Sequence, residues 1–571
     1  MLKKIIYLLN IVLVICFTSG CKKDVEDRKA DAIMEDLVWD QSDSLGIVAD
    51  YFVNNLYNYL PDGFNRIDGD YLDAATDDAI PSRNSTQIAY FTNGRVSTLN
   101  YPDPYFSKAY AGIRRVNILL ANLPKMALKN DPVYATTKQY WKAEGRFIRA
   151  MCYWELVKRF GSAPLIGDKV FTLNDNLELP RNSFEDCIEY IVGECDAIKD
   201  SLRTDLVSTT DWGRIGKGAA LALKSRVLLY AASPLYNGGG IEKSESLKKL
   251  NGYTDYKVER WTRAANAAKD VLDISAFKLE VEFRNVFTTL RSTEIILATQ
   301  RAKTTDLENN NSPVGFNTAS ITSRGYTSST QELVDAFPMN TGKAITEVGS
   351  GYTPQNPYSN RDSRLQFTVF CNGNRWVSRN IETFDGGKDR PGGSAIQTKT
   401  GYYARKFMGY FDNPASTFTA YSAQSHNFIL FRLGEILLNY AEALNESGRT
   451  TEAYAPLIEL RKRAKITAGT GSLYGLKAAL PQLDMRKLIQ NERRIELAFE
   501  EHRFWDIRRW KLASTLLNGK LHGIRITKTG STLTYAVEEV ADVRFADRLY
   551  KMPIPYSEIS KNKNLLQNEG W

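Results

Sequence analysis

The sequence predicts a mainly α-helical protein, a tetratricopeptide-like scaffold of helical pairs with a loop-rich region that contains short β-strands. Amphipathic stretches with apolar residues at helical spacing recur between Leu45 and Leu272 and again from Phe428 onward. Between them, residues 301–426 are rich in Gly, Asn, Ser, Thr and Pro and have few periodic runs. Stacked helix pairs are the simplest way to bury so many apolar stripes.

Composition excludes several classes of function. The chain has 571 residues, of which 43% are hydrophobic and 25% charged, as in folded globular proteins. Its formal net charge is +8, but no basic run interleaved with aromatic residues occurs, so we expect no nucleic-acid partner. The sequence contains no Gly-x-Ser-x-Gly elbow, P-loop or His-Glu-x-x-His pattern. We therefore expect no catalytic residues, no cofactor and no metal.

The beginning of the chain has the pattern of a bacterial lipoprotein signal peptide, predicted to span residues 1–20. Two lysines precede an apolar stretch from Ile5 to Phe17, which is too short to span a membrane as a helix. Small residues then lead to Cys21. We expect lipidation of Cys21, with residues 21–40 as a charged tether, so that the protein is anchored to a membrane by lipid.

Four other cysteines remain in the predicted mature chain: Cys152, Cys187, Cys195 and Cys371. Cys187 and Cys195 are eight residues apart in a helical pattern, which corresponds to about 12 Å along a helix axis. That separation is too long for a disulfide within one helix. We expect these cysteines to pack as small hydrophobic side chains.

Six helices are predicted before the loop-rich region, each from an apolar stripe that ends at a turn residue or a change of pattern. They span residues 45–60, 105–123, 138–160, 184–202, 216–232 and 261–272. The third has Trp141, Glu144, Phe147, Met151 and Trp154 on one stripe. These stripes are predicted to form the core.

A further pair follows the loop-rich region. Residues 428–446 and 451–464 form two helical patterns separated by a short turn at Gly448. Together they span about 37 residues, near the tetratricopeptide period. The earlier pairs have longer connections, so the repeat is degenerate.

The stretch 490–511, QNERRIELAFEEHRFWDIRRWK, is predicted to be an amphipathic helix with unusual charges. Glu492, Glu496 and Glu500 recur at a spacing of four residues, and five arginines lie within reach: Arg493, Arg494, Arg503, Arg508 and Arg509. Some of these charges must lie beside large aromatic rings, where a charge persists only when it is paired. A di-metal helix requires Glu-x-x-His, but Phe499 stands three residues before His502. We interpret the stretch as an ion-pair network that fixes the C-terminal part to the fold.

Several segments, in order, resemble the SusD/RagB family of Bacteroidetes outer-membrane lipoproteins. They are Thr-Asp-Asp-Ala at 76–79, Tyr-x-x-Ile-x-x-x-Asn at 110–117, Arg-Phe-Gly-x-x-Pro-Leu at 159–165, GRIGKGAALALKSRVLLYAASPLYN at 213–237, LVDAFPMNTGK at 333–343, NPYSNRDSRL at 356–365, the stretch 490–511, and YKMPIPYSEISKNKNLLQNEGW at the end. Glu569 stands where proline is usual in the family. The resemblance extends from Cys21 to Trp571.

This resemblance implies a function and a location. SusD-like proteins are non-enzymatic surface lipoproteins that bind glycans or other nutrients and cap a TonB-dependent transporter barrel, which receives the ligand. We therefore expect a SusD-like domain over residues 41–571, with a helical scaffold at 41–300 and 427–571 and a ligand or partner region at 301–426. The expected partners are a glycan or other small nutrient, a SusC-like barrel and the outer membrane, with the protein exposed on the cell surface.

Candidate ligand contacts lie in two irregular polar stretches, because aromatic rings stack on the apolar faces of sugars and polar loop residues bind hydroxyl groups. The family resemblance assigns Asp78 and Arg83 by position, and residue type adds Tyr90, Asn93 and Tyr101. The second stretch offers Asn309, Asn310, Arg324, Tyr326, Tyr352 and Trp376. Each of these residues also has a structural alternative, in which it satisfies its own turn or contacts the barrel.

Two other functions remain open on sequence grounds. A lipid-anchored glycoside hydrolase requires two carboxylates across a cleft, roughly 5 to 10 Å apart. Asp77 and Asp78 are adjacent, and the chain offers no distinctive second partner. A helical-repeat adaptor that binds only protein requires no sugar-stacking site.

Overall fold

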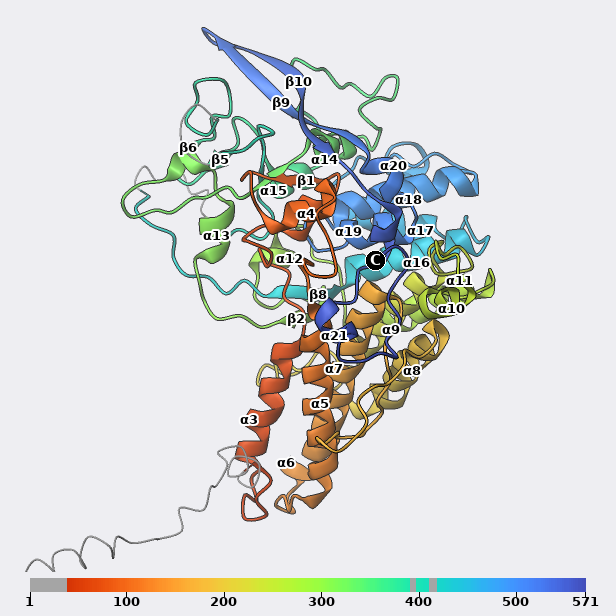
Figure 1. Ribbon diagram of the computed structural model, residues 1–571. Helices are drawn as coiled ribbons and strands as arrows, with labels where there is room; N and C mark the ends of the chain where they lie inside the picture. Colours follow the sequence, from red (N-terminus) through yellow and green to blue (C-terminus); the bar gives the residue numbers. More distant parts are fainter. Residues whose placement is uncertain (1–37, 391–396, 410–417) are drawn as a thin grey trace, which may run out of the picture.

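The computed structural model describes residues 38–390, 397–409 and 418–571 and confirms a mainly helical architecture with small two-stranded sheets (Figure 1). The longer helices are α3 (Ile47–Leu56), α5 (Tyr105–Asn122), α7 (Thr137–Phe160), α8 (Phe184–Ile198), α9 (Lys217–Ala232), α11 (Glu259–Leu272), α16 (Leu433–Glu446), α17 (Tyr454–Arg463) and α18 (Gln482–Glu496). The predicted signal peptide and Cys21 lie outside the described residues. Among those described, no helix is both long enough and apolar enough to cross a membrane.

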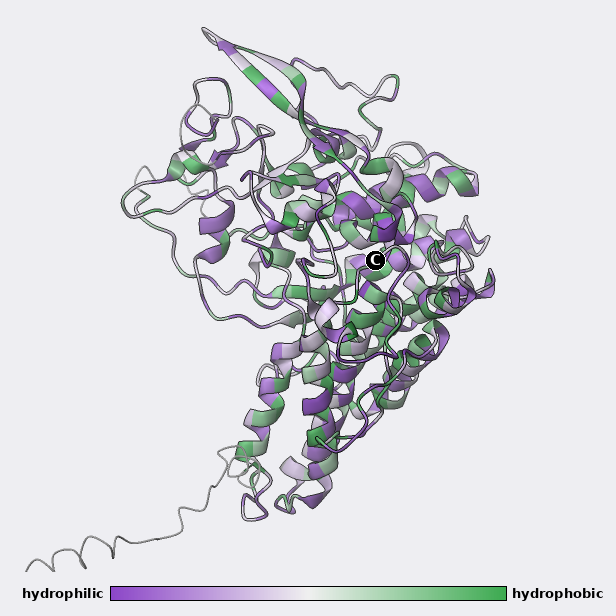
Figure 2. Ribbon diagram, in the orientation of Figure 1, coloured by the Kyte–Doolittle hydropathy of each residue, from purple (hydrophilic) through white to green (hydrophobic). Residues whose placement is uncertain are grey.

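Neighbouring helices pack in a continuous series, as expected for stacked pairs. α5 contacts α7, α7 contacts α8, α8 contacts α9, α9 contacts α11, α11 contacts α16, and α16 contacts both α17 and α18. α9 lies inside this series and is buried on nearly all sides, which explains its Ala- and Leu-rich sequence. Figure 2 shows the hydrophobic residues of the helices concentrated where the helices face one another.

Small residues allow the first helices to approach closely. A Cβ at Gly145 of α7 would lie 2.9 Å from Leu119 of α5, and a Cβ at Gly112 of α5 would lie 2.9 Å from the sulfur of Cys152. The predicted stripe of α7, including Trp154, is buried. All four remaining cysteines are buried free thiols, which confirms their packing role.

The loop-rich region forms short elements, as predicted. It contains α13 (Asp306–Asn311), α14 (Gln331–Ala336), α15 (Arg364–Thr368), β3 (Thr327–Ser329), β4 (Val369–Phe370), β5 (Arg375–Trp376), β6 (Arg379–Asn380) and β7 (Tyr403–Ala404). β4 pairs with β7 and β5 pairs with β6, both antiparallel. In Figure 1 this region lies beside the helical series rather than within it.

The predicted helix 428–446 begins later than expected. Residues Phe428–Arg432 form a strand, β8, which pairs antiparallel with β2 (Ile295–Thr299), and helix α16 starts only at Leu433. All five residues of β8 are buried. A short run that is apolar on every side has no periodicity to separate strand from helix, so the pattern alone was ambiguous.

The C-terminal part also contains a hairpin that the helical prediction for 427–571 did not include. β9 (Gly519–Thr529) and β10 (Thr532–Val543) pair antiparallel and project from the body of the molecule (Figure 1). The two-residue turn has Gly530 at φ +63°, a left-handed conformation that glycine adopts readily.

The stretch 490–511 is two helices rather than one. α18 ends at Glu496, and α19 (Arg503–Arg509) begins after a break in which Phe499 and Glu501 have φ of +63° and +60°. The backbone N–H of Phe499 donates to Oδ1 of Asp73 at 2.9 Å. A buried carboxylate from the N-terminal part thus stabilises the break, which the local sequence pattern could not indicate.

Candidate functional site

The two polar stretches predicted to bind ligand meet at a short antiparallel sheet. β1 (Ala79–Pro81) pairs with β3, and the backbone N–H of Ser82 donates to the carbonyl oxygen of Tyr326 at 2.7 Å. Arg83 follows β1 and Tyr326 precedes β3. The sheet therefore brings together side chains that are more than two hundred residues apart in the sequence.

The guanidinium group of Arg83 lies over the Tyr326 ring, with its carbon 3.8 Å from the ring centroid. This is a cation–π contact. Nη2 of Arg83 also donates to Oδ2 of Asp70 at 2.9 Å. Gly69, at φ +85°, leaves room for the ring, since a Cβ there would lie 2.7 Å from Cδ2 of Tyr326. Arg83 and Gly69 together fix the position of the ring.

Two more predicted residues join this cluster. Nη1 of Arg324 donates to Oδ1 of Asn310 at 3.0 Å, and the Arg324 guanidinium carbon lies 5.8 Å from the Tyr326 centroid. Arg324 is exposed and has no carboxylate partner in the part of the chain that the structure describes. We call Arg83, Asn310, Arg324 and Tyr326 the Tyr326 cluster.

The Tyr326 cluster has the chemistry of a site for an oxygen-rich ligand. The exposed guanidinium group of Arg324 presents several N–H donors in a fixed plane, which suits hydroxyl and carboxylate oxygens, while Arg83 is half-buried beside it. The partly exposed Tyr326 ring adds an apolar surface beside them. None of the cluster residues is a nucleophile beside a base.

Asp70 holds Arg83 from below the surface. It is buried, and Oγ1 of Thr327 donates to its Oδ1 at 3.0 Å. Burial raises the pKa of Asp70 to about 7, although Arg83 and Thr327 act in the opposite direction. Sequence reasoning missed both Gly69 and Asp70, because an Asp-Gly-Asp tripeptide indicates only a turn.

Tyr90 and Asn93 lie on the short helix α4 (Tyr90–Asn93). The Arg95 guanidinium carbon is 4.9 Å from the Tyr90 centroid, and Oδ1 of Asn93 accepts from the backbone N–H of Arg95 at 3.2 Å. The side chain of Asn93 therefore partly satisfies its own turn. Oδ2 of Asp68 accepts from the backbone N–H of Gln87 at 2.6 Å, which links this segment to the turn beside Tyr326.

Asp78 is placed differently from the expectation. Its side chain is buried, and Oδ1 accepts from Nε of Arg494 at 2.6 Å. The neighbouring Asp77 pairs with Arg503 at 2.7 Å. Burial alone would raise the pKa of Asp77, but Arg494 and Arg503 hold this pKa well below its usual range. These carboxylates are internal counter-ions, so the structure does not place Asp78 at an exposed surface as the sequence had suggested.

Tyr101 and Trp376 are likewise in the core rather than at a binding surface. Tyr101 packs edge-to-face against Phe91. Trp376 is fully buried, and its indole N–H donates to the hydroxyl of Tyr421 at 3.1 Å. Residue type and a loop-like sequence context had suggested exposure, but large rings in irregular segments also provide the apolar contacts that such segments need.

The two remaining candidates lie at the edges of the region. The carbonyl oxygen of Asn309 accepts from the backbone N–H of Arg324 at 2.8 Å, and its side chain bonds to Thr305. Tyr352 is half-buried, with the Arg361 guanidinium carbon 5.7 Å from its centroid. Asn309 therefore borders the Tyr326 cluster through its backbone.

A buried ion-pair network fixes the elements behind these loops. Glu492, Glu496 and Glu500 are buried, and the cations that pair with them among the described residues come from outside the 490–511 stretch and not from its own arginines, as the sequence had suggested: Arg364, Arg461, Arg432, Arg463 and Lys406. The pairing confirms the predicted structural role of these carboxylates. The described residues contain no group of three or more side chains suited to hold a metal ion.

Fold and surface together define a helical-pair scaffold that presents an aromatic, guanidinium-rich cluster on adjoining loops. The SusD family profile matches residues 293–571, and a profile described as starch-binding and associating with the outer membrane matches residues 27–229. The chain belongs to the SusD/RagB family. The SusD family is one of non-catalytic glycan-binding proteins, which agrees with the expectation that the chain is not an enzyme.

Relatives match over most of the chain. SusD-like protein P2 of Formosa agariphila is 25% identical over 493 residues, which cover 83% of this chain and 80% of the relative. A crystal structure of a SusD-like protein from Bacteroides fragilis has a TM-score of 0.76 at 26% identity and covers 95% of this chain and 99% of its own.

Two further structures share the fold. Surface glycan-binding protein A from Bacteroides fluxus has a TM-score of 0.61 at 20% identity, covering 91% of this chain and 98% of its own. A laminarin-binding SusD-like protein has a TM-score of 0.62 at 19% identity, covering 92% and 99%. At these identities the likeness concerns the fold alone.

Proposed function

We propose that this protein binds a glycan at the outer surface of the outer membrane and delivers it to a TonB-dependent transporter barrel that it caps. The observation that supports this proposal most directly is the Tyr326 cluster, in which a partly exposed ring and two arginines from separate chain segments converge. Family membership supports a glycan as the ligand, and two of the structural neighbours are a laminarin-binding and a surface glycan-binding protein.

The structure supports a shallow site with few anchors. Tyr326 and Tyr90 are both only partly exposed, and each already has a guanidinium group close to its ring. Few desolvated contacts give weak binding, so we expect dissociation constants of about micromolar to millimolar for short oligosaccharides.

Calorimetry with a panel of oligosaccharides tests the binding site. Tyr326→Ala and Tyr90→Ala should weaken binding while the melting temperature stays unchanged. Tyr51→Ala, which alters an exposed tyrosine on α3, is the matched control and should bind like the wild type. Unfolding of the Tyr326 variant would instead assign that ring to the core, and release of shorter sugars on incubation would contradict a binding-only role.

Anchoring and partnership form a second part of the proposal. Cys21 carries the lipid, and residues 21–40 connect it to the folded domain that starts near α3. Cys21→Ser should move the protein from the membrane fraction to the soluble fraction while glycan binding is retained. Co-purification of the tagged wild type with a TonB-dependent barrel tests the partner, and isolation without one from solubilised outer membranes would count against it.

A further inference from the structure

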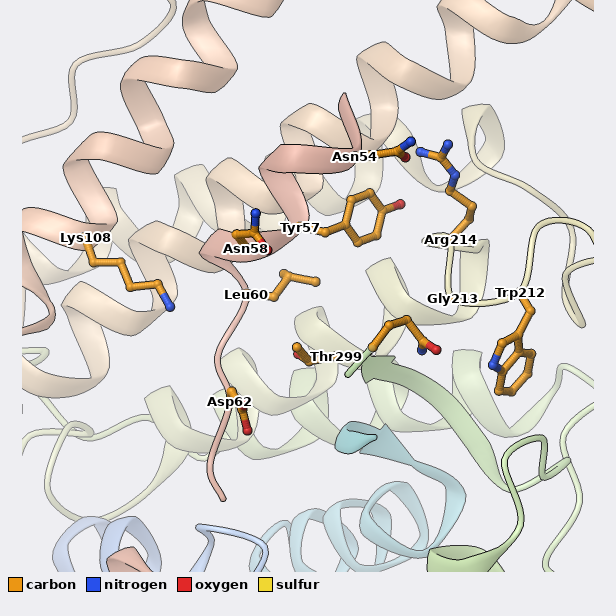
Figure 3. Close-up of a pocket in the computed structure, with 11 residues that line it drawn as sticks. Asn54, Tyr57, Asn58, Leu60, Asp62, Lys108, Trp212, Gly213, Arg214 and Thr299 are labelled. Atoms are coloured by element: carbon orange, nitrogen blue, oxygen red, sulfur yellow. The ribbon is translucent and has the colours of Figure 1, made fainter. Parts of the chain in front are cut away.

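A pocket of about 410 Å³ between α3, α5 and the end of β2 is lined by an arginine and an aspartate that already have partners (Figure 3). Arg214 donates to Asp50 at 2.8 Å, and Asp62 pairs with Arg301 at 3.3 Å. These two groups are therefore satisfied within the chain and do not indicate a ligand. The outer edge of strand β10 differs, because its backbone groups have no partner among the described residues.

The register of the hairpin shows which residues of β10 face away from β9. Thr529 and Thr532 flank the two-residue turn, and the residues at that position of a hairpin form a hydrogen-bonded pair. Hydrogen-bonded and non-hydrogen-bonded pairs alternate along an antiparallel ladder. Leu533, Tyr535 and Val537 therefore direct their N–H and C=O groups away from β9.

The corresponding outer edge of β9 is bonded to the body of the molecule. The N–H of Ile524 donates to the carbonyl oxygen of Thr400 at 2.7 Å, and the carbonyl oxygen of Ile526 accepts from the N–H of Asp385 at 2.7 Å. The outward N–H and C=O groups of residues 533–537 have no such partner within the described ranges. One edge of the hairpin is thus covered, and the other is open.

The open edge lacks several features that prevent strands from pairing. Edge strands are commonly protected by proline, lysine, a short length or a bulge. β10 extends over 12 residues and contains no proline or lysine, and the bulge between Glu539 and Ala541 lies outside residues 533–537. The Val537 side chain is 58% exposed, and Figure 1 shows the hairpin projecting from the body of the molecule. An exposed edge of this kind binds a further strand through backbone hydrogen bonds.

We propose that the further strand is β10 of a second copy of this chain, paired antiparallel so that Ala536 of one copy lies opposite Ala536 of the other. In this register Tyr535 and Val537 of one copy exchange backbone hydrogen bonds with Val537 and Tyr535 of the second copy. Their side chains then form aromatic and β-branched pairs, which stabilise a sheet. The small Ala536 side chains lie at the two-fold axis.

The charges of β10 are compatible with this register. Glu538 lies opposite Thr534 of the second copy and Glu539 lies opposite Leu533, so no two carboxylates face each other directly. Within each copy, Arg390 also donates to Glu538 at 2.9 Å. The dimer would contain a four-stranded sheet in the order β9–β10–β10–β9. This inference goes beyond the proposed function, because it holds whether or not the Tyr326 cluster binds a glycan.

Cysteine cross-linking of the purified full chain tests the register. Every variant carries Cys21→Ser, so that apart from the introduced cysteine only the four buried thiols remain in the predicted mature chain. The two Ala536 residues form a non-hydrogen-bonded pair with Cα atoms about 4.5 Å apart, and a disulfide needs roughly 4.4–6.8 Å. Ala536→Cys should therefore give a disulfide-linked dimer on mild oxidation.

Thr534→Cys is the matched control, because Thr534 is exposed on the same face of β10. In the proposed register the two copies of Thr534 lie about 13 Å apart along the strand, so this variant should remain monomeric under the same oxidation. Combining Thr534→Cys with Glu538→Cys should restore the cross-link, since these two residues lie opposite each other.

Sedimentation equilibrium measures the association without a cross-link. A single strand pair is a small interface, so we expect a dissociation constant of about 10–100 µM. Val537→Pro removes an N–H that faces away from β9, a position where strands tolerate proline, and should weaken the dimer at least about tenfold with an unchanged melting temperature. Tyr326→Ala should associate like the wild type, which separates this surface from the Tyr326 cluster.

Three results would each overturn the proposal. One is a wild-type chain that stays monomeric above the expected concentration range. The second is cross-linking of Thr534→Cys that equals or exceeds that of Ala536→Cys. The third is association of a folded Val537→Pro variant with wild-type affinity.

Discussion

Replacing Glu496 by glutamine tests whether the buried ion pairs hold the scaffold together. Glu496 on α18 accepts from Arg364 at 2.8 Å and from Arg432 at 2.7 Å, and it also pairs with Arg463. Burial alone would raise the pKa of Glu496, but these three arginines hold this pKa well below its usual range. Glutamine retains the shape but leaves three buried guanidinium groups short of one carboxylate.

The expected cost of this substitution is about 3–5 kcal/mol of unfolding free energy, the usual range when one partner of a buried pair is removed. We expect the lower end, because Glu294 and Glu492 still neutralise the same arginines. Urea unfolding measures the difference. Glu452→Gln removes an exposed partner of Arg449 and is the control, with no resolvable change expected.

The pH dependence gives a second, independent check. A carboxylate with a lowered folded-state pKa contributes stability that is present above its unfolded pKa, near 4.5, and is lost as the pH falls through the folded value. The stability difference between wild type and Glu496→Gln should therefore shrink on acidification below about pH 4.5. A loss smaller than about 1 kcal/mol at neutral pH, or a difference that does not depend on pH, would refute the reasoning.

Three further outcomes are expected. Gly69→Ala should destabilise the protein by about 1–3 kcal/mol and weaken glycan binding, because the new Cβ meets the Tyr326 ring. Gly94→Ala, at φ +78° with open space around it, is the control and should leave binding intact. Equal losses of binding in the two variants would contradict this. Because Asp70 keeps its proton up to about pH 7 in the fold, wild-type stability should fall as pH rises from about 4 to 7, and chemical denaturation of Asp70→Asn should lack that component. Burial lowers the pKa of Lys551 to about 7, so stability should rise between about pH 7 and 10, and Lys551→Met should flatten that rise; an unchanged slope would argue against it.

Long periodic stretches were predictable from the sequence because burial of one face decides their structure. Helices α5, α7 and α9 begin and end within a few residues of the predicted bounds. The strand β8 and the hairpin β9–β10 could not be predicted from the sequence, because a strand depends on a distant partner or on a face that the local pattern does not show. The break after Glu496 depends on Asp73, more than four hundred residues away.

The sequence identified two polar segments that adjoin the β1–β3 sheet, but it did not reveal which of the candidate side chains are internal. Arg83, Asn310, Arg324 and Tyr326 do converge, although their ligand contacts stay a prediction. Asp78, Tyr101 and Trp376 were candidates on the same grounds, as polar or aromatic residues in irregular segments, but they lie in the core. Residue type alone does not reveal whether a carboxylate meets an arginine of the same chain or a ligand.

The internal carboxylates explain why the scaffold and the surface cluster depend on each other. Asp77 and Asp78 pair with Arg503 and Arg494, so the segment that precedes β1 is held by the two helices α18 and α19. β1 in turn aligns β3, which places Arg83 over Tyr326. The Thr-Asp-Asp-Ala segment therefore has a structural role, because its two aspartates link the start of β1 to α18 and α19. It follows that substitutions at Arg83 and Tyr326 should alter ligand preference without loss of the fold, whereas substitutions at Asp77 should remove the fold and ligand binding together.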